Sequence, residues 1–273
     1  MTNSDIIELL RDALPSQYQV EGYLRSGGQG AVFRASLNGQ PIALKVFKPG
    51  HDPEFRRLER ELELLERIDC VNLVKVVRTD EIVLAGVNTR VVAYEYLGGG
   101  DLRQLLEPGH PTVSTETLLQ IGFQISNAIR TLWAERIVHR DVKPANIMQR
   151  EQGAYVLVDL GLARHLDRSD ITAPGAAPGT SGYKSPEQAR GVRNLTINSD
   201  VFSLGVTLYE IAAHEHPFGR NQLRIGVSEP RPLREIRPDL PGAFSRLIHQ
   251  MMAVVPAQRP ANVYAHFVQA LGR

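Results

Sequence analysis

The sequence predicts an α+β protein in which a small β-rich region precedes a larger α-helical region. Short alternating apolar segments dominate residues 18–97, long helical periodicities follow them, and Gly98-Gly99-Gly100 separates the two regions. With 273 residues and 42% apolar side chains, the chain is long enough to bury a substantial core in two modest lobes.

The first region begins with a short amphipathic helix at residues 4–14, where apolar residues recur at helical spacing. Alternating apolar positions then predict strands at 18–24, 31–37 and 40–47. Asn38-Gly39 lies between the last two strands and is a strong signal for a two-residue hairpin turn. We therefore expect the sheet to be antiparallel.

A single helix interrupts the strands of this region. Asp52-Pro53 supplies an N-cap and a first-turn proline, and residues 52–68 carry apolar side chains on one face. Two more strands are expected near 73–79 and 90–96. The first region is thus predicted to be a small antiparallel β-rich lobe with one key helix.

The second region is dominated by helical periodicity and is expected to form the larger, α-helical lobe. Its helices are predicted at 101–107, 114–136, 199–213, 241–254 and 261–271. Residues 165–182 show no periodicity, and their run of Ala, Pro and Gly predicts a mobile loop of unusual length.

Charge and cysteine content narrow the function classes. The 31 basic and 30 acidic residues give a net charge of +1, which offers no electrostatic basis for binding nucleic acid or an anionic membrane. Cys70 is the only cysteine, so an intrachain disulfide is impossible and a reducing, cytoplasmic location is expected. The acidic opening segment does not fit a signal peptide, and no stretch approaches membrane-spanning length, so we expect no membrane anchor in this chain.

The segment from His139 to Asn146 contains the densest group of residues suited to chemistry. Asp141 follows an apolar pair and Asp159 ends a predicted strand at 155–158, so both carboxylates are delivered at the ends of buried elements. Asn146 adds an amide oxygen, and carboxylate and amide oxygens are ligands that Mg²⁺ accepts. Lys143 can neutralise phosphate charge. These residue types indicate phosphoryl transfer, which depends on alignment, charge neutralisation and a metal.

Three features of the first region fit the same chemistry, and each also has a purely structural interpretation. Gly27-Gly28-Gln29-Gly30 either donates backbone N–H groups to phosphates or forms an ordinary glycine-rich hairpin. Lys45 stands among apolar neighbours and needs an anionic partner, unless its strand lies at a sheet edge. Glu61 falls inside the apolar arc of helix 52–68 and either provides that partner or reaches water from the rim.

These motifs, together with Asp159-Leu160-Gly161, occur in the order of the protein-kinase signature set. Nearly the whole chain resembles a eukaryotic-type serine/threonine protein kinase domain, and its compact length resembles bacterial members. The resemblance implies a two-lobed protein-kinase-like fold with an N-terminal helical extension at 1–17, an N-lobe at 18–97 and a C-lobe at 98–273. The implied activity transfers the γ-phosphate of ATP, with Mg²⁺, to serine or threonine of a protein substrate.

The resemblance also implies individual roles. Asp141 would orient the substrate hydroxyl and accept its proton, and Lys143 would steady the γ-phosphate. Lys45, fixed by Glu61, would hold the α- and β-phosphates, while Asn146 and Asp159 would bind magnesium. The remaining residues implied in nucleotide binding are Leu24, Gly27, Gly28, Gly30, Val32, Ala43, Glu95, Leu97 and Met148.

Residues 179–187 resemble the substrate-docking end of a kinase activation segment, with Ser185 where alanine is more familiar. By the same resemblance Glu187 would pair with Arg259, and Asp200 would cap the catalytic loop. Arg140 would receive a phosphate added to Thr172 or, less favoured, Ser169; the alternative is that neither hydroxyl is modified. Such self-modification would involve association between two copies of the chain.

Two departures from the family pattern stand out, namely Arg25 at the first glycine position and Leu160 in place of phenylalanine. Two other functions remain open at this point. One is a pseudokinase that binds partners without turnover, and the other is a small-molecule phosphotransferase of related fold. The second would not be expected to carry the segment 179–187 or the Glu187 and Arg259 pair.

Overall fold

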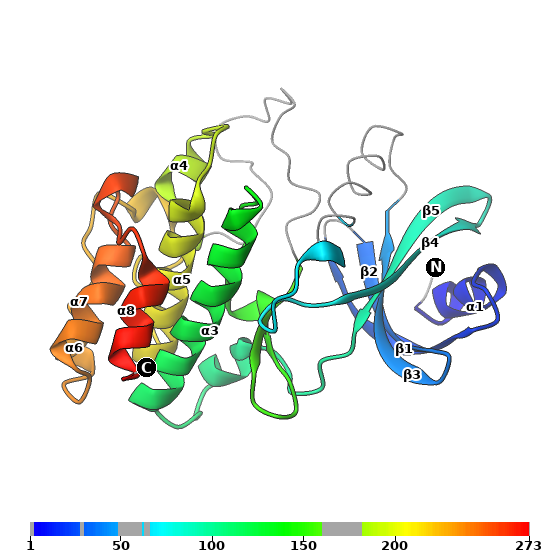
Figure 1. The fold of residues 1–273 in the computed structure, drawn as a ribbon, viewed down its shortest axis with the longest axis horizontal. Coiled ribbons are helices and arrows are strands. Elements are labelled where there is room, and N and C mark those ends of the chain that lie inside the picture. Colours follow the sequence, from blue (N-terminus) through cyan, green and yellow to red (C-terminus); the bar gives the residue numbers. More distant parts are fainter. Residues whose placement is uncertain (1–2, 28–29, 49–61, 63–65, 160–181, 273) are drawn as a thin grey trace. The chain divides into compact units, whose positions relative to one another are not determined.

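The computed structural model describes residues 3–27, 30–48, 62, 66–159 and 182–272, which fall into two compact units. Unit 1 comprises Met1–Asp69 and Val74–Gly98, and unit 2 comprises Cys70–Leu73 and Gly99–Arg273. Figure 1 shows that unit 1 holds a five-stranded sheet and helix α1, whereas the other labelled helices belong to unit 2. An antiparallel sheet in the first unit and helices in the second confirm the α+β class.

The sheet of unit 1 is antiparallel throughout, with the strand order β1-β2-β3-β5-β4. Its strands are β1 Tyr18–Gly27, β2 Gly30–Leu37, β3 Gln40–Phe47, β4 Val76–Leu84 and β5 Val87–Glu95. The predicted hairpin between β2 and β3 is confirmed. Its turn residues Asn38 and Gly39 have φ angles of 52° and 78°, the left-handed conformation that an Asn-Gly turn favours.

The extent predicted for the last two strands was wrong. Instead of ending near residue 79 and resuming near residue 90, the chain stays extended from Val76 to Leu84 and from Val87 to Glu95. Within β4, the charged residue Asp80 accepts hydrogen bonds from Tyr18 on β1 and from Arg78. A carboxylate with such partners can stay within a strand.

Helix α1 (Asn3–Ala13) confirms the amphipathic helix predicted at residues 4–14, and it packs against one face of this sheet. Leu10 is fully buried in a core that includes Phe33, Leu44 and Ala93 from three strands. Arg11 on α1 also donates through Nη2 to the carbonyl oxygen of Val20, at 2.9 Å. The helix is therefore an integral part of the core of unit 1.

Unit 2 is mainly helical. Its α-helices are α3 Thr115–Ala134, α4 Pro186–Ala189, α5 Ile197–Ala213, α6 Leu233–Ile236, α7 Gly242–Met251 and α8 Val263–Ala270. The 3₁₀ turns are η1 Leu102–Leu106, η2 Pro144–Asn146, η3 Gln222–Arg224 and η4 Pro256–Gln258.

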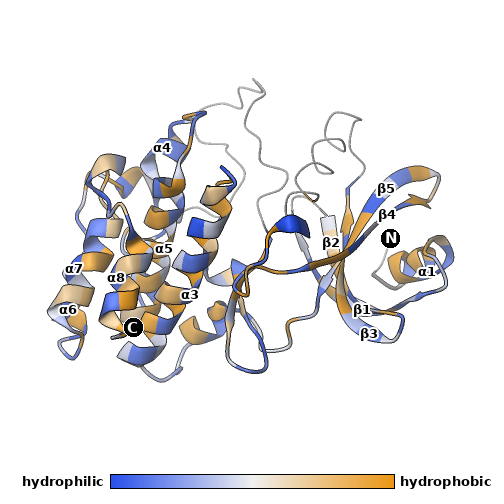
Figure 2. Ribbon diagram, viewed as in Figure 1, coloured by the Kyte–Doolittle hydropathy of each residue, from blue (hydrophilic) through white to orange (hydrophobic). Residues whose placement is uncertain are grey.

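Helix α5 lies at the centre of unit 2, with every residue from Ser199 to Ala212 buried. It packs against α3 and α7, and α3 also packs against α8. Figure 2 shows apolar residues distributed along α3 and α5 where the two helices run alongside each other. Surrounding helices thus explain why α5 is buried on all sides.

The four long helices predicted for the second region are confirmed, but the segment at 101–107 forms the 3₁₀ turn η1 instead of an α-helix. Asp101 caps this turn by accepting the N–H of Arg103, and a short segment of this kind cannot bury enough surface to extend further. Helices α4 and α6 have four residues each and were not predicted, since one turn carries too little periodicity.

A two-stranded antiparallel ribbon of β6 Ile147–Gln149 and β7 Tyr155–Leu157 completes the described secondary structure of unit 2. The ribbon confirms the strand predicted near 155–158. Asn146 directly precedes β6, and Asp159 follows shortly after β7. The pairing of the two strands therefore brings these two residues to the same end of the ribbon.

Several predicted features lie outside the described residues. These are most of helix 52–68 including Glu61, residues Gly28 and Gln29, Leu160 and Gly161, the proposed loop as far as residue 181, and the hydroxyls of Ser169 and Thr172.

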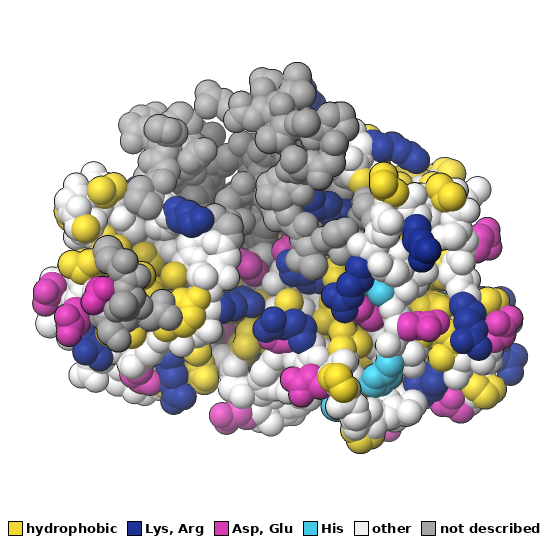
Figure 3. Space-filling view, turned by 180° about the vertical axis from the view of Figure 1, so that it is seen from behind, with side chains coloured by type: hydrophobic (Ala, Val, Ile, Leu, Met, Phe, Trp, Pro, Cys, Tyr) yellow, Lys and Arg dark blue, Asp and Glu magenta, His cyan; other side chains and the backbone are white. Residues whose placement is uncertain are grey.

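The described surface carries both signs of charge. Figure 3 shows Lys and Arg side chains interspersed with Asp and Glu over the face that it displays. This distribution agrees with the net charge of +1 and gives that face no extended field of one sign. Among the described residues, no helix combines the length and the apolar character needed to span a membrane.

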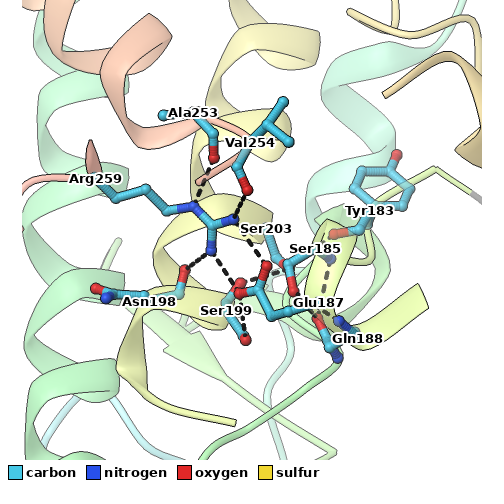
Figure 4. A network of polar contacts seen from close by, with 10 residues as sticks. All are labelled: Tyr183, Ser185, Glu187, Gln188, Asn198, Ser199, Ser203, Ala253, Val254 and Arg259. Atoms are coloured by element: carbon cyan, nitrogen blue, oxygen red, sulfur yellow. Dashed lines mark hydrogen bonds and ion pairs between the residues drawn. The ribbon is translucent and has the colours of Figure 1, made fainter. Parts of the chain in front are cut away.

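A buried arginine ties three segments of unit 2 together (Figure 4). The guanidinium of Arg259 forms a bidentate pair with Glu187, with Nη1–Oε1 and Nη2–Oε2 distances of 2.6 and 2.9 Å. It also donates to the backbone carbonyls of Asn198, Ala253 and Val254. The predicted pair is confirmed, and all the planar donor positions of the side chain are used.

Glu187 is ionised in this arrangement. Burial alone would raise the pKa of Glu187, but the hydrogen bonds from Arg259 and Ser199 outweigh burial and hold the pKa below its usual range. Because the folded-state pKa is depressed, the pair stabilises the fold at neutral pH. That contribution is lost only as the pH falls through the depressed value.

Replacing Arg259 with Met should lower the free energy of unfolding by about 3–5 kcal/mol, because Glu187 would be left as an uncompensated buried charge. Urea unfolding followed by circular dichroism measures this change. The matched control is Arg103→Met. Arg103 also forms a bidentate pair, with Asp101, but its side chain is 64% exposed. This substitution should cost about 0–1 kcal/mol. Equal costs for the two variants would contradict the prediction.

Candidate active site

The segment from His139 to Asn146 is held by Asp200 from the first turn of α5. The two carboxylate oxygens of Asp200 accept the backbone N–H groups of His139 and Arg140, each at 2.8 Å. Burial raises the pKa of Asp200, while the two N–H donors and the nearby positive charges oppose that rise. The predicted capping of this loop by Asp200 is confirmed.

Asp141 lies at the centre of a small polar cluster. Its Oδ2 accepts a hydrogen bond from Nζ of Lys143 and another from Nδ2 of Asn146, both at 2.8 Å. The same amide nitrogen donates to the backbone carbonyl of Asp141 at 2.8 Å. The side chains of Asp141 and Lys143 are 19% and 13% exposed, so the carboxylate is mostly buried but still accessible from one side.

His139 connects this cluster to the residue that precedes Asp159. Its Nε2 lies 3.1 Å from the carbonyl oxygen of Val158, which can only accept, so Nε2 carries the proton. Nδ1 then accepts the backbone N–H of Asp141 at 3.3 Å. The N–H of Val158 in turn donates to the carbonyl of Asn146, at 2.9 Å. One continuous network thus joins Asp141, Asn146 and Val158, the residue before Asp159.

Two residues of this network have left-handed backbone conformations, with φ of 69° at Arg140 and 59° at Asp159. Such angles are uncommon in residues other than glycine and cost of order 1–3 kcal/mol each, so they persist only where the surroundings impose them. Here Asp200 and His139 provide hydrogen bonds on either side of them. Strain at Asp159 and directly before Asp141 is typical of a functional site.

The donor set of this cluster fits a magnesium ion. Both hydrogen bonds described for the Asn146 amide use its nitrogen, so the amide oxygen, which is the atom able to bind a hard cation, is directed away from Asp141. One carboxylate and one amide oxygen suit Mg²⁺, which commonly retains waters and phosphate oxygens as its other ligands.

Lys45 lies in the middle of the sheet of unit 1, so the edge-strand interpretation does not apply. β3 pairs with β2 and β5, and Lys45 stands opposite Val32 and Val92. Its side chain is buried, with 7% exposed, and its ammonium lies 4.9 Å from the ring centre of Phe47. The partner predicted for it, Glu61, falls outside the described residues.

The strand register assigns the predicted nucleotide residues of unit 1 to one face of the sheet. Val32 and Ala43 share the face of Lys45, because side chains two residues apart or directly opposite point the same way. Leu44, the neighbour of both Ala43 and Lys45, belongs to the core on the opposite face, where α1 packs. The face that carries Lys45 is therefore distinct from the face that α1 covers.

The other predicted nucleotide residues have varied surroundings. Leu24 is 44% exposed beside an irregularity in β1, and Leu97 is buried near the end of unit 1. Glu95 bonds to the backbone of Lys75 through both its N–H and its carboxylate. Met148 lies on β6 in unit 2, opposite Val156.

The two described glycines of the glycine-rich segment differ in their structural requirement. A side chain at Gly30 would place its Cβ 2.0 Å from the carbonyl oxygen of Val46, so the sheet itself demands glycine there. A Cβ at Gly27 would meet nothing within 4 Å. Packing among the described residues therefore does not explain why residue 27 is a glycine. A role of Gly27 in phosphate binding stays a prediction.

The described part of the activation-segment motif, residues 182–187, is anchored to α5 (Figure 4). Ser203 donates to the carbonyl of Tyr183 at 2.8 Å, and Ser199 donates to the carboxylate of Glu187 at 2.8 Å. The hydroxyl of Tyr183 also donates to Glu210, another residue of α5. This segment is thus fixed to the helix that provides Asp200.

Sequence reasoning did not single out Gln188, and it noted Ser185 only as a departure from the family pattern. They form a capping box at the start of α4, and Gln188 also donates to the carbonyl of Arg140 at 2.9 Å. The pattern Ser-x-x-Gln is a known sign of a helix start and could have revealed the cap. Nothing in the pattern indicates the contact with Arg140, which lies 48 residues away.

Comparisons with known proteins agree with this geometry. A protein kinase domain model matches residues 18–270. The serine/threonine-protein kinase pkn3 of Myxococcus xanthus is 32% identical over 287 residues, covering 97% of this chain and 51% of that protein. The serine/threonine-protein kinase PknA of Mycobacterium tuberculosis is 32% identical over 256 residues, covering 90% of this chain and 58% of that protein. The chain spans 40% of a further relative, a probable serine/threonine-protein kinase of Corynebacterium efficiens, so these relatives are considerably longer than it is.

Solved structures show the same fold. The crystal structure of the Mycobacterium tuberculosis PknI kinase domain superposes with a TM-score of 0.71 at 23% identity, covering 94% of this chain and 96% of that one. At this identity the likeness concerns the fold alone. Since the family model extends from the start of β1 to the end of α8, the chain belongs to the protein kinase domain family.

Proposed function

We propose that this chain is an ATP-dependent serine/threonine protein kinase that transfers the γ-phosphate of ATP to hydroxyl groups of proteins. The observation that supports the proposal best is the environment of Asp141, whose carboxylate is bonded to Lys143 and Asn146 in a loop held by Asp200. Membership of the family and the names of the relatives support the same activity.

Asp141 is assigned the role of orienting the substrate hydroxyl and accepting its proton at Oδ1 or Oδ2. Its contacts with Lys143 and Asn146 fix the direction of the carboxylate. The hydroxyl oxygen then forms the new bond to the γ-phosphorus, and the bond from that phosphorus to the departing ADP oxygen breaks. Lys143 neutralises charge on the phosphoryl group.

Asn146 and Asp159 would hold magnesium, which supplies neutralisation of the phosphate charge when bound. Lys45 would hold the α- and β-phosphates, with Glu61 as its partner. The remaining nucleotide contacts would come from Leu24, Gly27, Gly28, Gly30, Val32, Ala43, Glu95, Leu97 and Met148.

The proposal includes the cellular setting and the organisation of the chain. A cytoplasmic location is supported by the single, free cysteine Cys70. Residues 1–17 would form an N-terminal extension, 18–97 the N-lobe and 98–273 the C-lobe. Two copies of the chain would meet during phosphorylation of Thr172 or Ser169 in the activation segment.

The decisive experiment is incubation of the purified chain with radiolabelled ATP and Mg²⁺, together with a basic protein or an aminoglycoside. Label on the basic protein or on Ser and Thr of the chain itself supports the proposal. Label on the aminoglycoside alone would identify a small-molecule phosphotransferase, and nucleotide binding without any transfer would identify a pseudokinase.

Replacing Asp141 with Asn should lower kcat about 10²–10⁴-fold, which is the usual contribution of a positioned base. The amide keeps the size of the side chain but cannot accept the proton, so the Kd for ATP should change little. Initial-rate kinetics and nucleotide titration measure the two quantities. Asp12→Asn, an exposed site on α1, is the control and should leave both unchanged. Wild-type kcat in Asp141→Asn would exclude the assigned role.

Replacing Lys45 with Met should reduce kcat/KM for ATP about tenfold or more, since a charge-assisted hydrogen bond contributes about 1.5–3 kcal/mol. Lys48→Met, three residues along the same segment and exposed, provides the matched control. An equal effect of the two substitutions on kcat/KM would show that Lys45 does not contact the nucleotide.

A further inference from the structure

The amide of Gln188 joins the start of α4 to the loop that carries Asp141. Its Nε2 donates to the carbonyl oxygen of Arg140 at 2.9 Å. Its Oε1 accepts from Ser185, whose N–H and hydroxyl lie 3.1 and 3.2 Å away. Gln188 and Ser185 are 9% and 0% exposed, so this amide is buried and held at both its nitrogen and its oxygen.

The carbonyl that receives this bond belongs to the peptide directly before Asp141. The N–H of the same peptide donates to Nδ1 of His139 at 3.3 Å. Gln188 and His139 therefore hold the two sides of one peptide plane. That plane sets the direction in which the Asp141 side chain leaves the backbone.

This peptide needs support because Arg140 has a left-handed φ of 69°. An ordinary residue in that conformation tends to relax unless several contacts oppose the change. Asp200 holds the N–H of Arg140, and Gln188 holds its carbonyl, so the two groups fix both ends of the strained residue.

We infer that Gln188 is a positioning residue for phosphoryl transfer, which holds the Arg140 carbonyl and thereby aligns the carboxylate of Asp141. Gln188 acts only through the backbone and contacts no reacting atom. The inference rests on the proposed kinase function. Loss of the Gln188 donor should lower kcat and leave KM for ATP unchanged, since a displacement of about 1 Å at a reacting group is enough to lower the rate about 10²-fold.

The chain offers substitutions that separate this role from the capping of α4. Gln188→Glu retains a carboxylate oxygen for the Ser185 cap, the usual partner in a capping box, but loses the N–H donor to Arg140. Ser185→Ala has the opposite effect, because it removes the hydroxyl from the cap and keeps the donor. Gln188→Met has a similar volume but lacks both the acceptor for the Ser185 cap and the donor to Arg140. It replaces Gln188→Glu in the experiment if Gln188→Glu does not fold.

Steady-state kinetics with a protein substrate, with thermal unfolding midpoints measured alongside, test the inference. We expect Gln188→Glu to lower kcat roughly 10- to 100-fold with KM for ATP unchanged. Ser185→Ala should stay within about threefold of wild type, consistent with a loss limited to one cap hydrogen bond. If Gln188→Glu is unfolded, Gln188→Met must show the same kcat loss relative to Ser185→Ala.

If the wild type is active and Gln188→Glu has the same kcat, the inference is overturned while the proposed function stands. The same holds if Ser185→Ala loses as much kcat as Gln188→Glu, because the effect would then follow the helix cap. A wild-type chain that transfers no phosphate would overturn the proposed function and this inference together, and the two failures are therefore distinguishable.

Discussion

The arrangement of the candidate catalytic loop depends on one buried carboxylate. Asp200 is almost completely inaccessible to solvent, and both of its oxygens accept backbone N–H groups of the loop. A carboxylate buried in this way must be compensated by hydrogen-bond donors. The position of α5 thus determines where His139 and Arg140 lie, and with them Asp141, Lys143 and Asn146, which follow in the loop.

A second consequence concerns how the polar interior of unit 2 is organised. Helix α5 supplies Asp200 to the catalytic loop, and it supplies Ser199 and Ser203 to the segment at 182–187. Arg259, from the chain segment before α8, pairs with Glu187. Gln188, on α4, donates a hydrogen bond to the carbonyl oxygen of Arg140. The loop that holds Asp141 and the segment at 182–187 are therefore both supported by α5, so a displacement of one is expected to shift the other.

Much of this could be predicted from the sequence, and the exceptions have physical causes. The helices α3 and α5 and the strands β1 to β3 follow from apolar periodicity, which is local information. The strand predicted near 73–79 stops short of the end of β4, within which Asp80 finds its partner Tyr18 only once the sheet has formed. Within the site, Asp141, Lys143 and Asn146 are close in sequence and could be grouped from their chemistry. The hydrogen bond from Gln188 could not be predicted, since 48 residues separate it from Arg140 and no local sequence pattern indicates that the two residues meet.

Helix α1 has a practical significance of its own. It precedes the first residue matched by the family model, yet Leu10 is as inaccessible as any residue of the sheet core. A fragment designed from the family boundary, starting at Tyr18, would expose the apolar face of Phe33, Leu44 and Ala93 to solvent. Such a patch promotes self-association, so expression and crystallisation of the catalytic region should retain the residues that precede β1.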